Sequence, residues 1–481
     1  MKEQDTRSSE GVSAPAFLEQ TVRSLESWQD QHGRPFITVP GCSGNSHLRV
    51  NSEQALRWIM CQVMEETPEI ATTRQARETI RQLEGKSWGG ERHEVAVRSS
   101  LDQGRVCIDL ADDEGRVVLV EPEGWRVVPG SDVSTRFNRS SGTGPLPVPE
   151  RNPSGPDLRD VLNLACDDQY ILFCGSLVAA LWPKGPRFVT VLQGRQGTAK
   201  TTMGRVFVSL TDPHNNPVRS FPGSEQDLAL SCMDRRVLLF DNLSGLRQSQ
   251  SDQLCRVSSG AAHATRKLYT TDEISVTPSE ASLVLTGIGS VLERPDAIDR
   301  AIILNLSRIP SGSISAEEEL QARFETARPH LFALLVEGLW LALKNRNTIE
   351  AELPRMADAS RVAAASMPAF GFDPADFFAA YRRNEGEAYR SAVEASPIGE
   401  ALMDLVRDKG EWEGTHTALL GELDCYLTNG RRGPGWPRAA NALSREITRL
   451  LPAIERQGVS VEYSRSADSS SRKLIRLTSS S

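Results

Sequence analysis

The sequence lacks the cysteine and histidine spacings of a metal centre or a disulfide framework. Its eight cysteines include no CxxC pair, and its seven histidines include no His-x-x-x-His pair. Neither a zinc ribbon nor a disulfide-rich secreted fold is therefore indicated. We expect reduced, mostly buried thiols, as is usual in a cytoplasmic protein.

Long apolar runs are also absent, and so is a strong positive charge. No run approaches the ~18–20 apolar residues of a membrane-spanning helix, and Met1 to Pro15 has no apolar signal-peptide core. We expect residues 1–15 to be a disordered tail and the protein to be cytoplasmic, with no membrane partner. The net charge of −8 excludes a polycation, so any nucleic-acid surface must be local.

The length of 481 residues corresponds to several domains, since a typical domain has ~150 residues. Residues 139–156 are rich in Ser, Gly and Pro, which predicts a linker. Before it, short alternating strands predict an antiparallel meander; after it, apolar strands alternate with helices, which predicts a parallel sheet covered on both faces. We expect an N-terminal mixed α/β domain over 16–155, an α/β core over 156–312, a helical region over 313–395 and a C-terminal domain over 396–481.

The most informative segment is a phosphate-loop signature. The apolar run Phe188–Leu192 leads into Gly194-Arg-Gln-Gly-Thr-Ala-Lys-Thr-Thr202, where a helix is expected to begin. This strand–loop–helix order is typical of a P-loop, whose backbone N–H groups and helix N-terminus bind phosphate. We expect Lys200 to reach the β- and γ-phosphates of ATP, and the Thr201 hydroxyl to bind Mg²⁺. The full set of expected nucleotide contacts is Gly194, Gly197, Thr198, Ala199, Lys200, Thr201 and Thr202.

One position departs from the P-loop template. The residue before the lysine is usually Gly, and here it is Ala199. Alanine costs little at that position unless the backbone needs a positive φ.

A second acidic motif follows roughly forty residues downstream, as a P-loop site requires. The apolar run Val237–Phe240 ends in Asp241, which we expect beyond a strand neighbouring the loop strand, where it would share the Mg²⁺ with Thr201. Asn242 follows, in place of the Glu that commonly activates the attacking water. An amide can orient a water but is no general base, so the base stays unassigned.

Two further residues are candidates for the same chemistry. Thr286 ends the apolar strand Ala281–Leu285 and is a candidate sensor of the γ-phosphate; the alternative is a buried hydroxyl bonded to backbone. Arg300 precedes the strand Ala301–Leu304 and is a candidate to act on the nucleotide of a neighbouring subunit. The alternative for Arg300 is a surface ion pair with Asp296 or Asp299.

Local basic segments are candidate DNA contacts. Arg266 and Lys267 stand beside Tyr269, although such a pair is more often a solvated face. In the last domain, helices followed by two strands favour a winged helix-turn-helix. Its cations Arg438, Arg445 and Arg449 recur along a helical stretch, which fits DNA binding; protein contact is the alternative.

Taken in order, these motifs resemble the ATPase that accompanies the primases of phages and mobile elements, which is related to superfamily 3 helicases, to AAA+ proteins and to the poxvirus primase–helicase. The resemblance rests on five segments: residues 194–202, Leu239-Phe-Asp-Asn-Leu-Ser244, Thr265-Arg-Lys-Leu-Tyr-Thr270, Leu285-Thr-Gly287 and Arg294-Pro-Asp-Ala-Ile-Asp-Arg300. Weaker likenesses, such as Val97-Arg98 and Pro145–Pro149, extend it over nearly the whole chain from about residue 35.

The resemblance implies a P-loop NTPase core of the AAA+/superfamily 3 type, with ATP and Mg²⁺ as cofactors. It implies an ATP-dependent DNA helicase or translocase, working as a ring of usually six subunits on single-stranded or forked DNA in replication. It places Lys200 and Thr201 on the nucleotide and Mg²⁺, Asp241 at the second acidic motif, Thr286 as sensor and Arg300 as the trans-acting arginine. It also implies a basic hairpin that grips DNA in the interval of Arg266 and Lys267, which favours DNA contact by that pair. Because no primase domain is visible, a separate primase is the implied partner. The alternative from another class is a nucleotide-gated DNA-binding regulator or defence-system ATPase that does not unwind processively.

Overall fold

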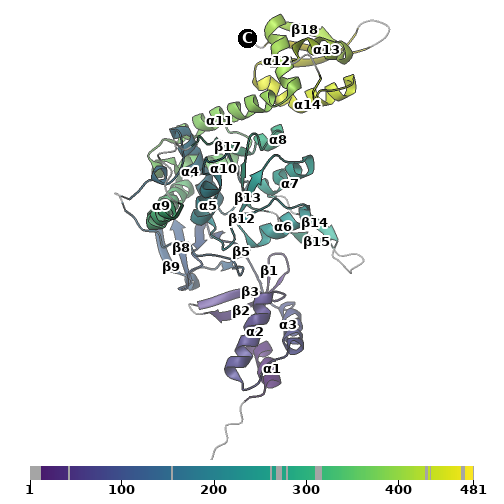
Figure 1. Ribbon diagram of the computed structural model, residues 1–481. Coiled ribbons are helices and arrows are strands. Elements are labelled where there is room, and N and C mark those ends of the chain that lie inside the picture. Colours follow the sequence, from purple (N-terminus) through teal and green to yellow (C-terminus); the bar gives the residue numbers. More distant parts are fainter. Residues whose placement is uncertain are drawn as a thin grey trace, which may run out of the picture. The chain divides into compact units, whose positions relative to one another are not determined.

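The computed structural model describes residues 12–41, 44–152, 155–260, 263–266, 274–277, 280–308, 317–427, 432–433, 435–466 and 472–479. Its contacts divide the chain into two compact units, whose elements are labelled in Figure 1. Unit 1 comprises Met1–Val148 together with two short internal pieces, Asp212–Asn216 and Asp234–Arg236. Unit 2 comprises Pro149–Thr211, Pro217–Met233 and Val237–Ser481.

The first half of unit 1 is a four-stranded sheet of order β3-β2-β1-β4 with three helices packed on its apolar side chains. Local signals set the helix starts: the Ser52 hydroxyl caps α2, and Thr72 and Gln75 form a capping box at α3. The elements are α1 (Ala14–Ser24), β1 (Glu26–Asp30), β2 (Pro35–Gly41), β3 (Gly44–Arg49), α2 (Glu53–Glu66), α3 (Thr73–Ser87) and β4 (Arg92–His93).

The second half of unit 1 contains the expected antiparallel meander, of order β6-β7-β8-β9. Val117 to Val120 of β8 are all buried, so this strand is a continuous apolar run in the sequence. The elements are β5 (Val95–Ala96), β6 (Ser99–Asp102), β7 (Arg105–Asp109), β8 (Arg116–Glu121), β9 (Gly124–Pro129), η1 (Gly130–Asp132) and β10 (Arg136–Phe137), with β5 and β10 paired in parallel.

Unit 2 is built on a five-stranded parallel sheet of order β12-β13-β16-β11-β17, which confirms the parallel sheet expected from the sequence. The central strands β11 and β16 are buried along their whole length, so their sequences are continuous apolar runs. The elements around the sheet are η2 (Leu158–Asp160), α4 (Asp167–Leu181), β11 (Val189–Gln193), α5 (Lys200–Thr211), β12 (Val218–Arg219), α6 (Glu225–Asp234), β13 (Val237–Leu243), α7 (Gln248–Ser258), β14 (His263–Arg266), β15 (Ile274–Thr277), β16 (Ser282–Gly287), α8 (Pro295–Ile298) and β17 (Ala301–Asn305).

Helices follow the sheet, as the sequence predicts. The side-chain amide of Asn384 in α11 bonds both the N–H and the C=O of Ile303, so this helix satisfies backbone groups of the edge strand β17. The elements of this helical part are α9 (Glu317–Asn345), η4 (Arg346–Thr348), α10 (Ala357–Ser366), η5 (Met367–Phe370) and α11 (Pro374–Glu394).

The C-terminal segment has the two expected strands, and a third strand, β18, pairs with them in the order β18-β20-β19. Trp412 of β18 lies opposite Leu477 of β20, which extends the small apolar sheet face. The elements are α12 (Pro397–Lys409), β18 (Glu411–Gly414), α13 (His416–Leu423), η6 (Asp424–Tyr426), α14 (Ala440–Arg456), β19 (Val459–Arg465) and β20 (Lys473–Ser479).

Three features differ from the sequence-based expectation. The division of the chain is not contiguous, because two pieces from the middle of the sequence are packed in unit 1. The Ser/Gly/Pro-rich segment expected to be a linker is partly fixed, since Leu146 is buried and its N–H bonds Leu110. The tail expected over 1–15 ends earlier, because α1 begins at Ala14, next to Pro15 at a helix N-terminus. Within the described part of the chain, no helix combines the length and apolarity that crossing a bilayer demands.

Candidate nucleotide site

The candidate site begins where β11 ends. Residues 194–199 form a loop, called here the 194–199 loop, that joins β11 to the first turn of α5. Only glycine fits at Gly194, because a Cβ there would lie 2.6 Å from the Leu306 carbonyl oxygen. Gly197 has a φ of +81°, which glycine adopts without strain. The buried Thr198 closes the loop by donating to the Arg195 carbonyl at 3.0 Å.

Ala199 has a φ of +59°, so the position before the lysine does require a left-handed backbone. The exception stated for this position therefore applies, and alanine is strained here. A non-glycine residue in this region costs about 1–2 kcal/mol. Such strain persists where the surrounding structure fixes the backbone, and it is common at functional sites.

The Lys200 ammonium folds back over the loop. Its Nζ donates to the carbonyl oxygens of Gly194 and Arg195, each at 2.8 Å. Partial burial lowers the pKa of Lys200, an effect opposed by the negative charge of Asp241. The loop carbonyls thus hold a positive charge beside the N-terminus of α5, where an anion is favoured.

Asp241 connects the loop helix to the sheet. Its Oδ1 accepts from the Thr201 hydroxyl at 2.9 Å and also from the Thr286 hydroxyl. Thr286 accepts in turn from the backbone N–H of Asn242 at 3.1 Å. The structure therefore brings Thr201, Asp241, Asn242 and Thr286 into one hydrogen-bonded cluster.

The path to this cluster differs from the one expected. Asp241 is not on the strand next to β11, because β16 lies between β11 and β13. β13 also runs past Asp241 to Leu243, with an irregular register between Phe240 and Leu243 and a φ of +60° at Asn242. A bulge re-aims the side chains beside it, which accounts for Asp241 reaching Thr201 from two strands away.

Arg300 lies apart from the cluster. β11 and β17 are parallel, with Val189 opposite Ala301 and Gln193 opposite Asn305, so Arg300 stands at the opposite end of the strands from the 194–199 loop. Five residues of strand separate the two ends, a distance on the order of 16 Å. The Arg300 guanidinium donates to the backbone carbonyl of Asp296 and to the Ser259 hydroxyl, whereas Asp299 bonds Tyr389.

The residues expected to contact DNA differ in whether the structure describes them and in whether they are exposed or bound to an acid. Lys267 lies outside the described residues, and Arg266 is the last residue of β14. Arg438 and Arg445 are exposed, one before α14 and one on it. Arg449 is bound bidentately by Glu446, at 2.6 and 3.1 Å, which neutralises it.

Two residues that the sequence did not single out support the 194–199 loop. The Asn163 amide donates to the carbonyls of Thr198 at 3.2 Å and Ser307 at 2.7 Å. The Gln193 amide donates to Asn305 at 2.6 Å, which joins the ends of β11 and β17. For Gln193, the signal in the sequence is a polar residue at the end of an apolar strand. Asn163 stands in no local pattern that predicts its contact with the loop.

The described residues include no group of three or more His, Cys, Asp or Glu side chains suited to hold a metal ion. Thr201 and Asp241 do supply two hard oxygen donors side by side. Mg²⁺ in phosphate-binding sites is held by one or two such donors together with substrate phosphates and waters. The donor set therefore fits a metal that arrives with a nucleotide.

Comparison with known families identifies the class of protein. Residues 157–386 match the family described as actinomycete integrative conjugative element replication protein, and residues 398–481 match the family described as AICE RepA C-terminal domain. The chain is a replication protein of a mobile element. Its nucleotide-site candidate and its C-terminal segment are the parts that these two families describe.

Other comparisons give weaker likenesses. The search of curated proteins gives no significant match. Among solved structures, the A form apo structure of the NrS-1 C-terminal region is 11% identical, with 97% of this chain and 100% of that chain covered at a TM-score of 0.40. A second apo structure of that region is 11% identical, with 98% and 100% covered at a TM-score of 0.37. TM-scores this low do not establish a shared fold.

Proposed function

We propose that this replication protein is a P-loop ATPase of the AAA+/superfamily 3 type that works on DNA as an oligomeric helicase or translocase. The observation that carries the proposal is the cluster of Thr201, Asp241 and Thr286 beside the 194–199 loop. These hydroxyl and carboxylate groups meet a lysine and a helix N-terminus at the carboxyl ends of parallel strands, where nucleotide sites of α/β proteins lie.

The residues have distinct roles in the proposed hydrolysis. Lys200 would leave the carbonyls of Gly194 and Arg195 to bind the β- and γ-phosphates, as charge on the phosphate exceeds that on a carbonyl. Thr201 and Asp241 would hold Mg²⁺, which neutralises phosphate charge when bound. The Asn242 backbone N–H holds the Thr286 hydroxyl, which in turn holds the Asp241 carboxylate, and the Asn242 side-chain amide would orient the attacking water.

The position of Arg300 supports action between subunits. It stands on the order of 16 Å of strand away from the loop of its own chain. An arginine supplied by another subunit can stabilise γ-phosphate charge, and Arg300 is too far from its own loop to do so there. We therefore propose a ring, of six subunits as in the resembled family, in which Arg300 completes the neighbour's site.

The C-terminal segment supports DNA binding. Its order of helix, strand, two helices and two strands, with an antiparallel sheet, fits a winged helix-turn-helix. The exposed Arg438, just before α14, and Arg445, on that helix, are suited to bind DNA phosphate. In this proposal the protein acts in the cytoplasm, and a separate protein supplies primers.

The test is ATP hydrolysis and unwinding by the full chain. We expect Mg·ATP hydrolysis to rise with single-stranded or forked DNA and a forked duplex to be unwound. Lys200→Ala should lower hydrolysis by roughly 100-fold or more, as the loss of one electrostatic stabiliser typically does. The matched control is Lys184→Ala, an exposed lysine of the same unit, which should change little.

The same experiments also distinguish the proposed motor from the competing function, a nucleotide-gated regulator. DNA-independent hydrolysis without unwinding, together with tight binding to one duplex sequence, would replace the motor by a nucleotide-gated regulator. The absence of ATP binding by the wild-type chain would reject both.

A further inference from the structure

The two elements that carry the candidate site both continue into unit 1. Residues 212–216, which belong to unit 1, follow directly on α5, and α5 begins with Lys200 and Thr201. Residues 234–236, also part of unit 1, lead directly into β13, which carries Asp241. The covalent chain therefore links each element, at the end distant from the site, to unit 1.

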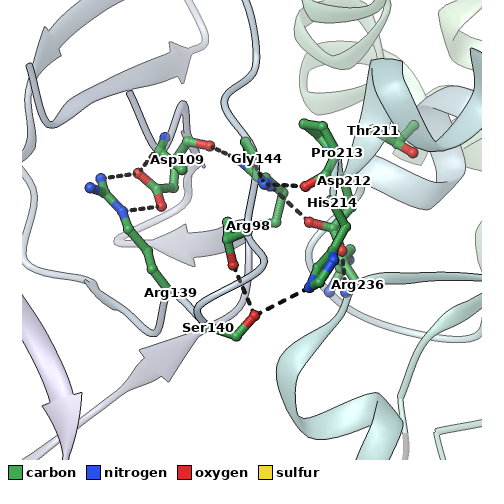
Figure 2. Close-up of polar contacts among 12 residues, drawn as sticks. Arg98, Asp109, Arg139, Ser140, Gly144, Thr211, Asp212, Pro213, His214 and Arg236 are labelled. Atoms are coloured by element: carbon green, nitrogen blue, oxygen red, sulfur yellow. Dashed lines mark hydrogen bonds and ion pairs between the residues drawn. The ribbon is translucent and has the colours of Figure 1, made fainter. Parts of the chain in front are cut away.

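Arg98 holds the first of these pieces within unit 1, as Figure 2 shows. Its side chain is 1% exposed. Nε donates to Asp212 Oδ1 at 2.9 Å, Nη1 to the Asp109 carbonyl at 3.0 Å, and Nη2 to the Gly144 carbonyl at 2.8 Å. The backbone of Arg98 has a φ of +64°, a strained conformation for a residue with a side chain. An arginine bound at every nitrogen in a buried site has one favoured geometry.

Asp212 joins the two pieces to each other. While Oδ1 is bound by Arg98, Oδ2 accepts from the backbone N–H of Arg236 at 2.7 Å. Arg236 immediately precedes β13, and Asp212 immediately follows α5. A single buried carboxylate thus fixes the end of the loop helix, the start of the acidic strand and a side chain of unit 1.

Arg98 and Asp212, with their hydrogen-bond partners, are called here the anchor. Backbone hydrogen bonds add to it. The Gly144 N–H donates to the Pro213 carbonyl at 2.8 Å, and the Asn215 N–H donates to the Gly142 carbonyl at 2.9 Å. A Cβ on Gly142 would lie 1.9 Å from the His214 ring, so a larger residue there would displace this ring. In Figure 2 the Ser140 hydroxyl also meets the His214 ring, at 3.4 Å.

We infer that the Arg98–Asp212 pair is a positioning device that couples the state of the nucleotide site to unit 1. The inference rests on the proposed nucleotide binding at Lys200. Phosphate binding that shifts α5 or β13 also shifts Asp212 or Arg236, because these residues are covalently attached to the two elements. A closely packed anchor transmits such a shift to Arg98 and its partners, since it does not deform continuously. By thermodynamic reciprocity, a partner bound to unit 1 would alter nucleotide affinity to the same degree.

The test is hydrogen exchange of the full chain with and without Mg·ATPγS. In the wild type, we expect nucleotide to change the exchange of amides 98–110 and 142–146 roughly fivefold or more, the size of ordinary allosteric coupling. Asp212→Asn keeps the volume and an acceptor for the Arg236 N–H but removes the charge that pairs with Arg98. Gly142→Ala disrupts the anchor by a different route. In both variants ATPγS should still bind, and the response in unit 1 should be lost.

The matched control is Arg105→Ala. It breaks a partly buried ion pair of the same unit, Arg105–Asp102 at 2.9 Å, and leaves the anchor intact. This variant should keep the wild-type response. A response lost in Arg105→Ala as well, or kept in both anchor variants, overturns the inference, as does ATPγS binding to the wild type without any change in unit 1. A wild type that binds no ATPγS instead rejects the proposed function, so the two failures are distinguishable.

Discussion

The Thr286 hydroxyl donates a hydrogen bond to the Asp241 carboxylate and thereby joins the ends of two adjacent parallel strands, β16 and β13. Thr286 is 1% exposed and also accepts the N–H of Asn242. The hydroxyl is thus buried and bonded to backbone, as the alternative expected, and it also bonds the acidic side chain of the candidate site.

Replacing Thr286 should therefore affect turnover. Thr286→Val keeps the shape but leaves the Asn242 N–H without its partner and Asp241 held, among the described residues, by the Thr201 hydroxyl alone. We expect kcat to fall roughly tenfold, since a hydrogen bond to a charged group contributes about 1.5–3 kcal/mol. KM should change less. Thr286→Ser, which retains the hydroxyl, should stay near wild type. Steady-state ATP hydrolysis measures both, and a variant that only unfolds more readily in urea would indicate a purely structural threonine.

Ala199 offers a test of stored strain. Because its φ is +59°, Ala199→Gly should raise the free energy of unfolding by about 0.5–1 kcal/mol, the balance of relieved strain and added chain entropy. Ala199→Val should lower it, since a β-branched side chain fits this backbone poorly. Urea unfolding gives both values. A destabilised glycine variant would contradict the assigned backbone.

Arg300 can be tested by mixing subunits. Arg300→Ala and Lys200→Ala should each hydrolyse ATP poorly alone, and Arg300→Ala should still bind ATP. Mixed in equal amounts, they should regain activity, because an intact Lys200 from one subunit can meet an intact Arg300 from the other. Hydrolysis that stays at the level of the separate variants would argue against a site shared in trans.

His47 gives a pH dependence for unit 1. Burial, together with the nearby positive charge of Arg136, lowers the pKa of His47 to about 4. An unfolded histidine titrates near 6.5, so between pH 6.5 and 4 the unfolded chain binds the extra proton and stability falls as the pH falls. We expect a loss of about 2 kcal/mol over this range after allowance for partial exposure. His47→Gln should flatten the pH dependence of unfolding, and an unchanged slope would remove His47 as its cause.

Much of the fold was predictable because local patterns encode it. Continuous apolar runs such as Val237–Phe240 predicted the buried parallel strands, and alternating valines predicted the meander. The strand order was not predictable, since nothing local places β16 between β11 and β13. For the same reason, Asp241 was expected one strand too close to the loop.

The sequence alone determined which chemical groups are present: a glycine-containing loop ending in Lys200-Thr201, an acid after a buried strand, and a hydroxyl after the next. Their types and spacing follow from short-range rules of strands, turns and helix starts. Only the tertiary structure decided that Thr286 bonds Asp241, that Ala199 has a positive φ, and that Arg98 binds Asp212. These relationships depend on contacts between residues up to 114 positions apart, and such contacts are set by the packing of whole elements and not by any local pattern.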